Sequence, residues 1–310
     1  MKSRSVAVVA ISLLLISGPL PSAAGESKGK KSPVLTLGVE TGRLLGSTLY
    51  HITVPTEQGA IESELEWSLD SWLAGITASL GSEGRWRADL SVLTNLSGVS
   101  GPMEDSDWLD GILFVFSESD VESDAFSAIV LDVSGRYRLV GAPQWTLAGV
   151  AGLLYQSFDL TAVNLSQYSP VGIEEFNAVV AGPVVTYAVS YTVPYLGAAL
   201  TLAPSPKLSL TLEARGGYAR GEDEDDHLLR LKRSRAETEG FALMGRMSGE
   251  YVYSPRFSLT AGLEVLSIET SGDQSQIFYG GPAAGTGFTG IPVELDTRQV
   301  LIALGARYRF

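Results

Sequence analysis

Two acidic stretches hold the residues whose types and spacing suit chemistry. Residues 101–110 read GPMEDSDWLD and place Asp105 two positions before Asp107, and residues 221–227 read GEDEDDH and place Asp225 two positions before His227. Residues two apart share a face on an extended strand. A carboxylate beside an imidazole sets its tautomer and stabilises its protonated form, so Asp225 can orient His227 as a general base. Two close carboxylates can share one proton and hold a water. If the fold brings the two pairs face to face, they predict a site that activates water and needs no side-chain nucleophile.

Other interpretations of these stretches stay open. Acidic runs in outer loops commonly serve solubility as solvated segments. A calcium loop is a second alternative, although Leu109 stands where a D-x-D-x-D-G loop needs its third acid. A zinc site built on His227 is a third, and chelation would inactivate either metal site while leaving an Asp-His site unaffected. The second histidine, His51, has no acidic motif beside it and is expected to be an ordinary loop residue.

The elements that must position these residues show the period of β-strands. In residues 207–215, apolar side chains alternate with polar ones, and the same period recurs in 86–92, 129–139 and 256–264. In residues 62–80 the apolar parity switches, which predicts a bulge near Asp70 and Ser71. The polar faces carry charges of both signs and the apolar faces almost none, a pattern that favours lipid over water as the outer solvent.

The connections between these strands alternate in length. Tight turns are expected at 81, 140, 203 and 253, and long connections at about 47–57, 96–123, 163–180, 221–236 and 272–292. The pattern predicts an all-β fold: a ten-stranded antiparallel transmembrane β-barrel with long extracellular loops and short periplasmic turns. Ten strands are too few for a wide aqueous channel. Function is therefore expected at the outer loops and rim.

The chain begins with Lys2 and Arg4, an apolar run to about residue 16, and the small residues Ser22, Ala23 and Ala24. This pattern predicts a cleaved signal peptide over 1–24 and one outer-membrane barrel domain over 25–310 of a Gram-negative-type bacterium. Cleavage would remove two basic residues and no acid, so the formal charge of −13 would become −15. Such a chain is a poor partner for nucleic acid. It contains no cysteine, which excludes disulfides and thiolate chemistry.

At these residues the chain resembles the omptin family of outer-membrane proteases. The resemblance runs through the whole mature chain, from LGVETGRL and LEW through MEDSDWLD and VPYLG to DEDDH. It implies an aspartic-type endopeptidase that cuts beside basic residues, with water activated between two acidic pairs. The implied catalytic residues are Asp105, Asp107, Asp225 and His227. The implied substrate-binding residues are Asp223, for the basic side chain before the cut bond, and Glu118, for the residue after it.

Partners follow from the same resemblance. Cationic peptides or proteins are the expected substrates of an acid-lined mouth, the barrel is expected to be a monomer in outer-membrane lipid, and no cofactor or metal is expected. Two positions depart from the family. Gly46 or Ser47 replaces a first-strand glutamate, and the wall that would bind lipopolysaccharide lacks Lys and Arg, so lipopolysaccharide is only a candidate activator. The basic run at 230–235 is expected to pair with the acids of 222–226. The alternative function is a non-catalytic barrel acting as an adhesin or binding protein.

Overall fold

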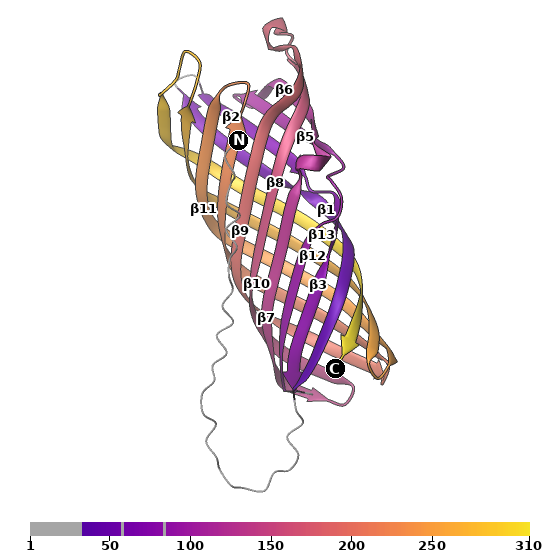
Figure 1. Ribbon diagram of the computed structural model, residues 1–310. Coiled ribbons are helices and arrows are strands. Elements are labelled where there is room, and N and C mark those ends of the chain that lie inside the picture. The colour runs from indigo at the N-terminus through magenta and orange to yellow at the C-terminus, as the bar shows by residue number, and fades with distance from the viewer. Residues whose placement is uncertain (1–32, 57–58, 83–84) are drawn as a thin grey trace. The chain divides into compact units, whose positions relative to one another are not determined.

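The computed structural model describes residues 33–310 apart from 57–58 and 83–84, and this part of the chain forms an antiparallel β-barrel (Figure 1). The predicted signal peptide lies outside the described residues. No helix in the described part is long and apolar enough to cross a membrane. The strands are β1 (Val34–Thr56), β2 (Gly59–Ser68), β3 (Ser71–Ser82), β4 (Trp86–Asn95), β5 (Pro102–Leu109), β6 (Ile112–Val121), β7 (Ser127–Ala142), β8 (Trp145–Tyr168), β9 (Ala178–Ser205), β10 (Leu208–His227), β11 (Lys232–Ser254), β12 (Phe257–Phe278) and β13 (Gly287–Arg309), with short 3₁₀ helices η1 (Ser123–Ala125) and η2 (Glu174–Phe176).

The strands build two stacked rings that share most of their members. β1 and β8 to β13 run through both rings; β3, β4 and β7 complete the lower ring, and β2, β5 and β6 complete the upper one. Each ring therefore contains ten of the described strands, as the sequence predicts. At three places around the barrel, an upper and a lower strand stand in for one continuous strand: β2 above β3, β5 above β4, and β6 above β7. The break between β2 and β3 falls at Leu69 and Asp70, beside the predicted bulge. There the N–H of Gly46 donates to Asp70 Oδ1 at 2.9 Å.

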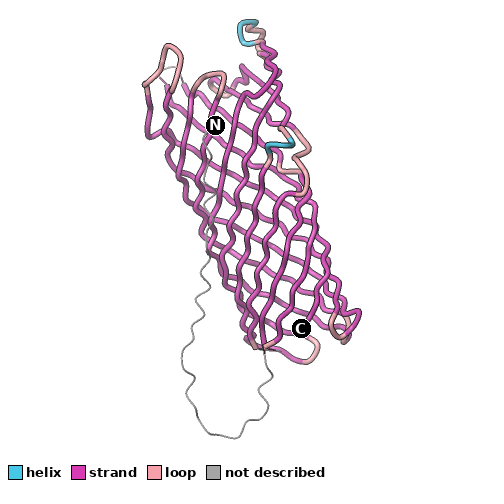
Figure 2. The backbone as a smooth tube through the Cα atoms, in the orientation of Figure 1, coloured by secondary structure: helices cyan, strands magenta, loops and turns pink. Residues whose placement is uncertain are grey.

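The strands run farther than the sequence analysis placed them. The tight turns lie at the predicted positions, but much of each long connection continues as a hydrogen-bonded hairpin (Figure 2). β9 has 28 residues, which at about 3.3 Å per residue is roughly 90 Å. A spanning strand needs only about 9–11 residues. The barrel therefore projects well beyond the membrane, and the acidic stretches lie on strands.

The outer surface marks where the membrane ends. On β11, Phe241 and Tyr251 are exposed aromatic residues that bracket Leu243 and Met247 on the lipid-facing side. About ten tilted residues cover roughly 25 Å, the height of the apolar band of outer-membrane barrels. Tyr218 of β10 is in register with Phe241. Asp223, Asp225 and His227, farther along β10, lie above this band.

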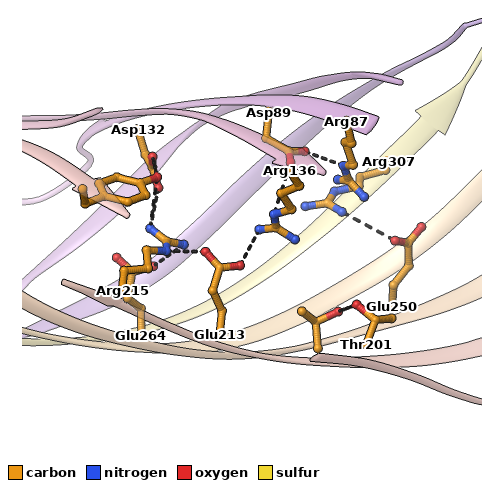
Figure 3. A network of polar contacts seen from close by, with 12 residues as sticks. Arg87, Asp89, Asp132, Arg136, Thr201, Glu213, Arg215, Glu250, Glu264 and Arg307 are labelled. Carbon is orange, nitrogen blue, oxygen red and sulfur yellow. Dashed lines mark hydrogen bonds and ion pairs between the residues drawn. The ribbon is translucent and has the colours of Figure 1, made fainter. Parts of the chain in front are cut away.

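Ion pairs cross the lower lumen and line a cavity of about 250 Å³ there. Arg215 Nη1 lies 2.9 Å from Asp132 Oδ2, and its Nε contacts Glu213. The Arg136 guanidinium lies 2.8 Å from the Glu213 carboxylate and 3.6 Å from that of Asp89, and so links the two acids (Figure 3). Further contacts link Arg87 to Asp89, Arg246 to Glu264 and Arg307 to Glu250. Side chains thus occupy this part of the lumen, which accords with the expectation that ten strands make no wide channel.

Candidate active site

The β10–β11 hairpin presents the Asp-His pair to the barrel interior. Asp223, Asp225 and His227 alternate with outward residues and are 7 %, 1 % and 6 % exposed. His227 Nε2 lies 2.9 Å from Asp225 Oδ2. The contact leaves Nδ1 as the ring nitrogen available to another group. The predicted shared face of these three residues is confirmed, because β10 stays paired with both β9 and β11 up to His227.

The β5–β6 hairpin carries the second pair. Asp105 is buried and Asp107 half-buried, and they are in register with Leu65 and Ser63 of β2. The hairpin turns at Asp110 and Gly111, whose φ angles are 50° and 75°. Both angles are in the left-handed region that Asp and Gly tolerate best. The segment predicted as a loop is therefore a strand hairpin that places both carboxylates on one face.

Electrostatics connect the two hairpins. Burial, and next the negative charge of Asp107, raise the pKa of Asp105. The charges of His227 and Arg230 act in the opposite direction on the same carboxyl group. The barrel thus brings together two segments more than a hundred residues apart, since Asp105 and His227 lie close enough to influence each other's charge.

Asp223 is the most perturbed acid of the mouth. Burial and then the charge of Asp225 raise its pKa to about 8. Among the described residues, no arginine or lysine forms an ion pair with Asp223, and both of its carboxylate oxygens are buried. A buried carboxylate without a cation is costly to ionise. Ionisation of Asp223 would therefore require a compensating positive charge.

An aromatic layer adjoins the acids. The rings of Trp67 and Tyr187 stack with centroids 5.4 Å apart, and Tyr50 meets Tyr187 edge-on at 6.4 Å. Tyr187 is the β9 residue in register with Asp225. Burial raises the pKa of Tyr50, and Asp225 and Asp223 raise it further. The sequence analysis missed this layer; its signal was the presence of large aromatic residues on faces that are otherwise polar.

Contacts on the outer side fix the β10–β11 hairpin. Asp226, next to Asp225, accepts hydrogen bonds from Arg233 Nη2 at 2.6 Å and from the Tyr279 hydroxyl at 2.8 Å. Arg233 also lies over the Tyr279 ring, 5.6 Å from its centroid. Arg235 pairs with Glu224 at 2.7 Å. The predicted pairing of the basic run with the acids is confirmed for these residues.

Lys232 differs from the rest of that run because it points inward. It is in register with His227. Burial lowers its pKa, and the charge of Asp225 opposes that shift. Its ammonium group therefore contributes positive charge on the same side as the acids of the mouth.

Glu118 is not brought to this group. It is exposed on the outer face of β6, while its neighbours Ser117 and Ser119 are buried inside. Its register partner is Glu104. Alternation along a strand is strict, so Asp105 and Glu118 are on opposite faces of the hairpin. The hairpin therefore does not bring Glu118 together with Asp105, and its role in binding the residue after the cut bond stays a prediction.

Position 46 agrees with the expectation from the sequence, whereas position 51 differs from it. Gly46 has a φ of 130°, and an added Cβ would lie 2.0 Å from the carbonyl oxygen of Arg298, so no acidic side chain fits there. His51 has acidic neighbours after all: its ring nitrogens lie 4.0 Å from Glu62 and 3.9 Å from Glu294 on adjacent strands. It faces outward, away from Tyr50. Cross-strand pairing supplies partners that a one-dimensional motif search does not see.

Metal ligation is the remaining question for these acids. In the described ranges, no group of three or more His, Cys, Asp or Glu side chains is arranged to hold a metal ion. The possible metal ligands at the mouth are the carboxyl groups of Asp105, Asp107 and Asp225 and the imidazole of His227. Asp225 already contacts His227.

The fold and the site together define an outer-membrane β-barrel with an acidic, histidine-containing site at its outer mouth. The Omptin family profile matches residues 31–278. The chain is 23 % identical to the plasminogen activator of Yersinia pestis over 99 % of this chain and 100 % of that protein. It resembles the crystal structure of the outer membrane protease OmpT from Escherichia coli, with a TM-score of 0.77, 17 % identity, and coverage of 89 % of this chain and 97 % of that one.

The chain therefore belongs to the omptin family, as its motifs predicted. Its place is the outer membrane, with the acidic mouth facing the exterior.

Proposed function

We propose that this omptin is an endopeptidase that cleaves cationic polypeptides beside basic residues, using water activated between Asp225–His227 and Asp105–Asp107. Outer-membrane protease activity is supported by the family and by its relatives. The observation that carries the finer proposal is the buried Asp225–His227 contact at 2.9 Å, on one face with Asp223 and within electrostatic reach of Asp105.

The proton movements follow from this arrangement. His227 takes a proton from water through Nδ1 while Asp225 stabilises the resulting imidazolium. The water oxygen attacks the scissile carbonyl carbon. Asp105 and Asp107 share a proton, because burial and mutual repulsion disfavour two adjacent charges. As the C–N bond breaks, the departing amine takes the proton from protonated His227, which restores the neutral imidazole. No side-chain nucleophile is needed, so no acyl-enzyme forms.

Substrate choice rests on Asp223. Its buried carboxyl group has no cation of its own among the described residues, so an incoming Arg or Lys side chain before the cut bond would pair with it. The glycine at position 46 leaves the mouth without a glutamate from the first strand. We therefore expect a looser preference for arginine over lysine than two acids would impose.

The test uses refolded barrel and quenched peptides centred on Arg-Arg, Arg-Lys, Arg-Val and Ala-Lys, with and without lipopolysaccharide. Cleavage by the wild type and its loss in His227→Ala are expected. EDTA should not inhibit an Asp-His site, whereas a metal site would lose activity. Heat-modifiable electrophoretic mobility shows that each barrel is folded. A folded wild type that cleaves none of the peptides would overturn the proposal and favour a surface-binding role.

A further inference from the structure

The short-turn end of the barrel is as basic as the outer mouth is acidic. Seven arginines lie on the strands and turns there, of which Arg85, Arg256 and Arg309 are exposed, in a chain whose formal charge is −13. A cavity of about 350 Å³ opens among six of them, and Glu250 is its one acidic lining residue in the described part of the chain. The six arginines are Arg85, Arg87, Arg136, Arg138, Arg256 and Arg309.

The acids nearby are already committed to other partners. Asp89 pairs with Arg87 at 2.6 Å, and Glu250 pairs with Arg307 at 3.6 Å. Arg136 is held by Glu213 deeper in the lumen (Figure 3). The lining arginines nearest the opening thus keep an excess of positive charge.

Three of the arginines have no acidic partner among the described residues: Arg85, Arg138 and Arg256. Arg256 Nη1 donates to the Tyr308 hydroxyl at 3.3 Å, a neutral acceptor. Arg138 is anchored through its backbone N–H, which donates to the Arg85 carbonyl at 2.9 Å. These residues belong to different strands and turns, and all three line the cavity.

That geometry selects the kind of anion. A planar carboxylate uses one guanidinium fork well, whereas a tetrahedral phosphate offers oxygens to several forks at once. Neutralising unpaired like charges in a partly enclosed space also makes multivalent anions the better ligands. Trp86, Val252 and Phe257 add apolar surface beside the arginines, where carbon groups attached to a phosphate can pack.

We propose that this cavity is a binding site for phosphate-type anions on the periplasmic side of the barrel. The proposal is independent of proteolysis, because the site is at the opposite end of the lumen from His227. Phosphate groups could reach it as soluble phosphates or as the headgroups of anionic phospholipids, which share the recognised chemistry.

The test is isothermal titration calorimetry of refolded barrel in octyl glucoside, a detergent without phosphate. One arm titrates inorganic pyrophosphate, a second uses micelles containing dioleoylphosphatidylglycerol, and a third uses a poly-glutamate peptide. The test variant is Arg138→Gln/Arg256→Gln. The matched control is Arg220→Gln/Arg298→Gln, which removes the same charge from exposed positions elsewhere. Heat-modifiable mobility confirms folding of both variants.

Saturable binding of pyrophosphate, weakened about tenfold or more in the test variant and unchanged in the control, is expected. Binding in the pyrophosphate arm alone would identify a soluble phosphate as the ligand, and binding in the lipid arm alone would identify a headgroup. Binding of poly-glutamate without either phosphate probe would overturn the proposal. The same conclusion follows if no probe binds, or if both variants weaken binding equally.

Discussion

The lower lumen and the outer mouth use the same kinds of side chain in opposite ways. In the lumen, Asp132 and Glu213 each contact Arg215, and Arg136 extends the chain of charges. At the mouth, Asp105 and Asp223 have buried oxygens and form no ion pair with another described residue. Buried charge is tolerable when it is paired and costly when it is not. The charges of the lumen are therefore paired within the chain, while these two carboxyl groups of the mouth have no such cation among the described residues.

The largest effect on activity is expected when the proposed general base, His227, is removed. His227→Ala should lower kcat by about 10² to 10⁴, because proton transfer by a positioned base contributes that much. The variant should fold normally, since His227 ends a hairpin that Asp226, Arg233 and Tyr279 also hold. Peptide cleavage under saturating substrate measures the effect. Full activity in both His227→Ala and Asp105→Ala would remove the proposed mechanism.

Substitutions in the lower lumen should change the stability of the barrel and leave its catalytic activity nearly unchanged. Arg215→Ala leaves Asp132 and Glu213 without their central cation, which should destabilise the barrel by about 3–5 kcal/mol. The free energy of unfolding in urea from lipid vesicles measures this change. Arg298→Ala, at an exposed position, should have little effect. The kcat of folded Arg215→Ala should stay near that of the wild type; a large fall would show that the two regions are coupled.

The pH dependence of cleavage tests whether Asp223 binds the basic side chain of the substrate. Its pKa is raised to about 8, so it is mostly neutral below that pH and attracts a cation more strongly above it. Wild type and Asp223→Asn should therefore have similar kcat/KM for an Arg-containing peptide at pH 6. By pH 9 the wild type should be about tenfold better, because only its carboxyl group ionises. Parallel pH profiles for the two proteins would contradict a role in cation binding.

The smallest effect is expected on the outer side of the site. Tyr279→Phe removes the hydrogen bond to Asp226 Oδ1 at 2.8 Å, a loss of about 1 kcal/mol. Looser positioning of the neighbouring Asp225 should lower kcat several-fold and leave KM nearly unchanged. Tyr253→Phe, at an exposed position near the opposite end of the barrel, is the control. An equal effect of both changes would show that Tyr279 has no special role.

Sequence reasoning recovered the barrel because its signal is local. Alternation along β10 separates Glu213 and Asp223 from Leu210 and Leu212, and the tight turns lie where Pro and Gly cluster. The same reasoning did not show that Glu118 lies on the opposite face of its hairpin from Asp105, because that depends on how β5 and β6 pair. It also stopped the strands too early, since polar residues above the membrane look like loops although they remain hydrogen-bonded to their neighbours.

The sequence by itself determined the strand period, the ten-position barrel and the spacing that gives Asp225 and His227 one face. These properties depend on the chain's own period of two and on the solvent at each face. Only the tertiary structure decided which distant groups meet. Closure of the barrel lets Asp105 and His227 influence each other, gives His51 its acidic neighbours, and gathers Arg85, Arg138 and Arg256 around one cavity. Such contacts depend on register and burial, which no short stretch of sequence encodes alone.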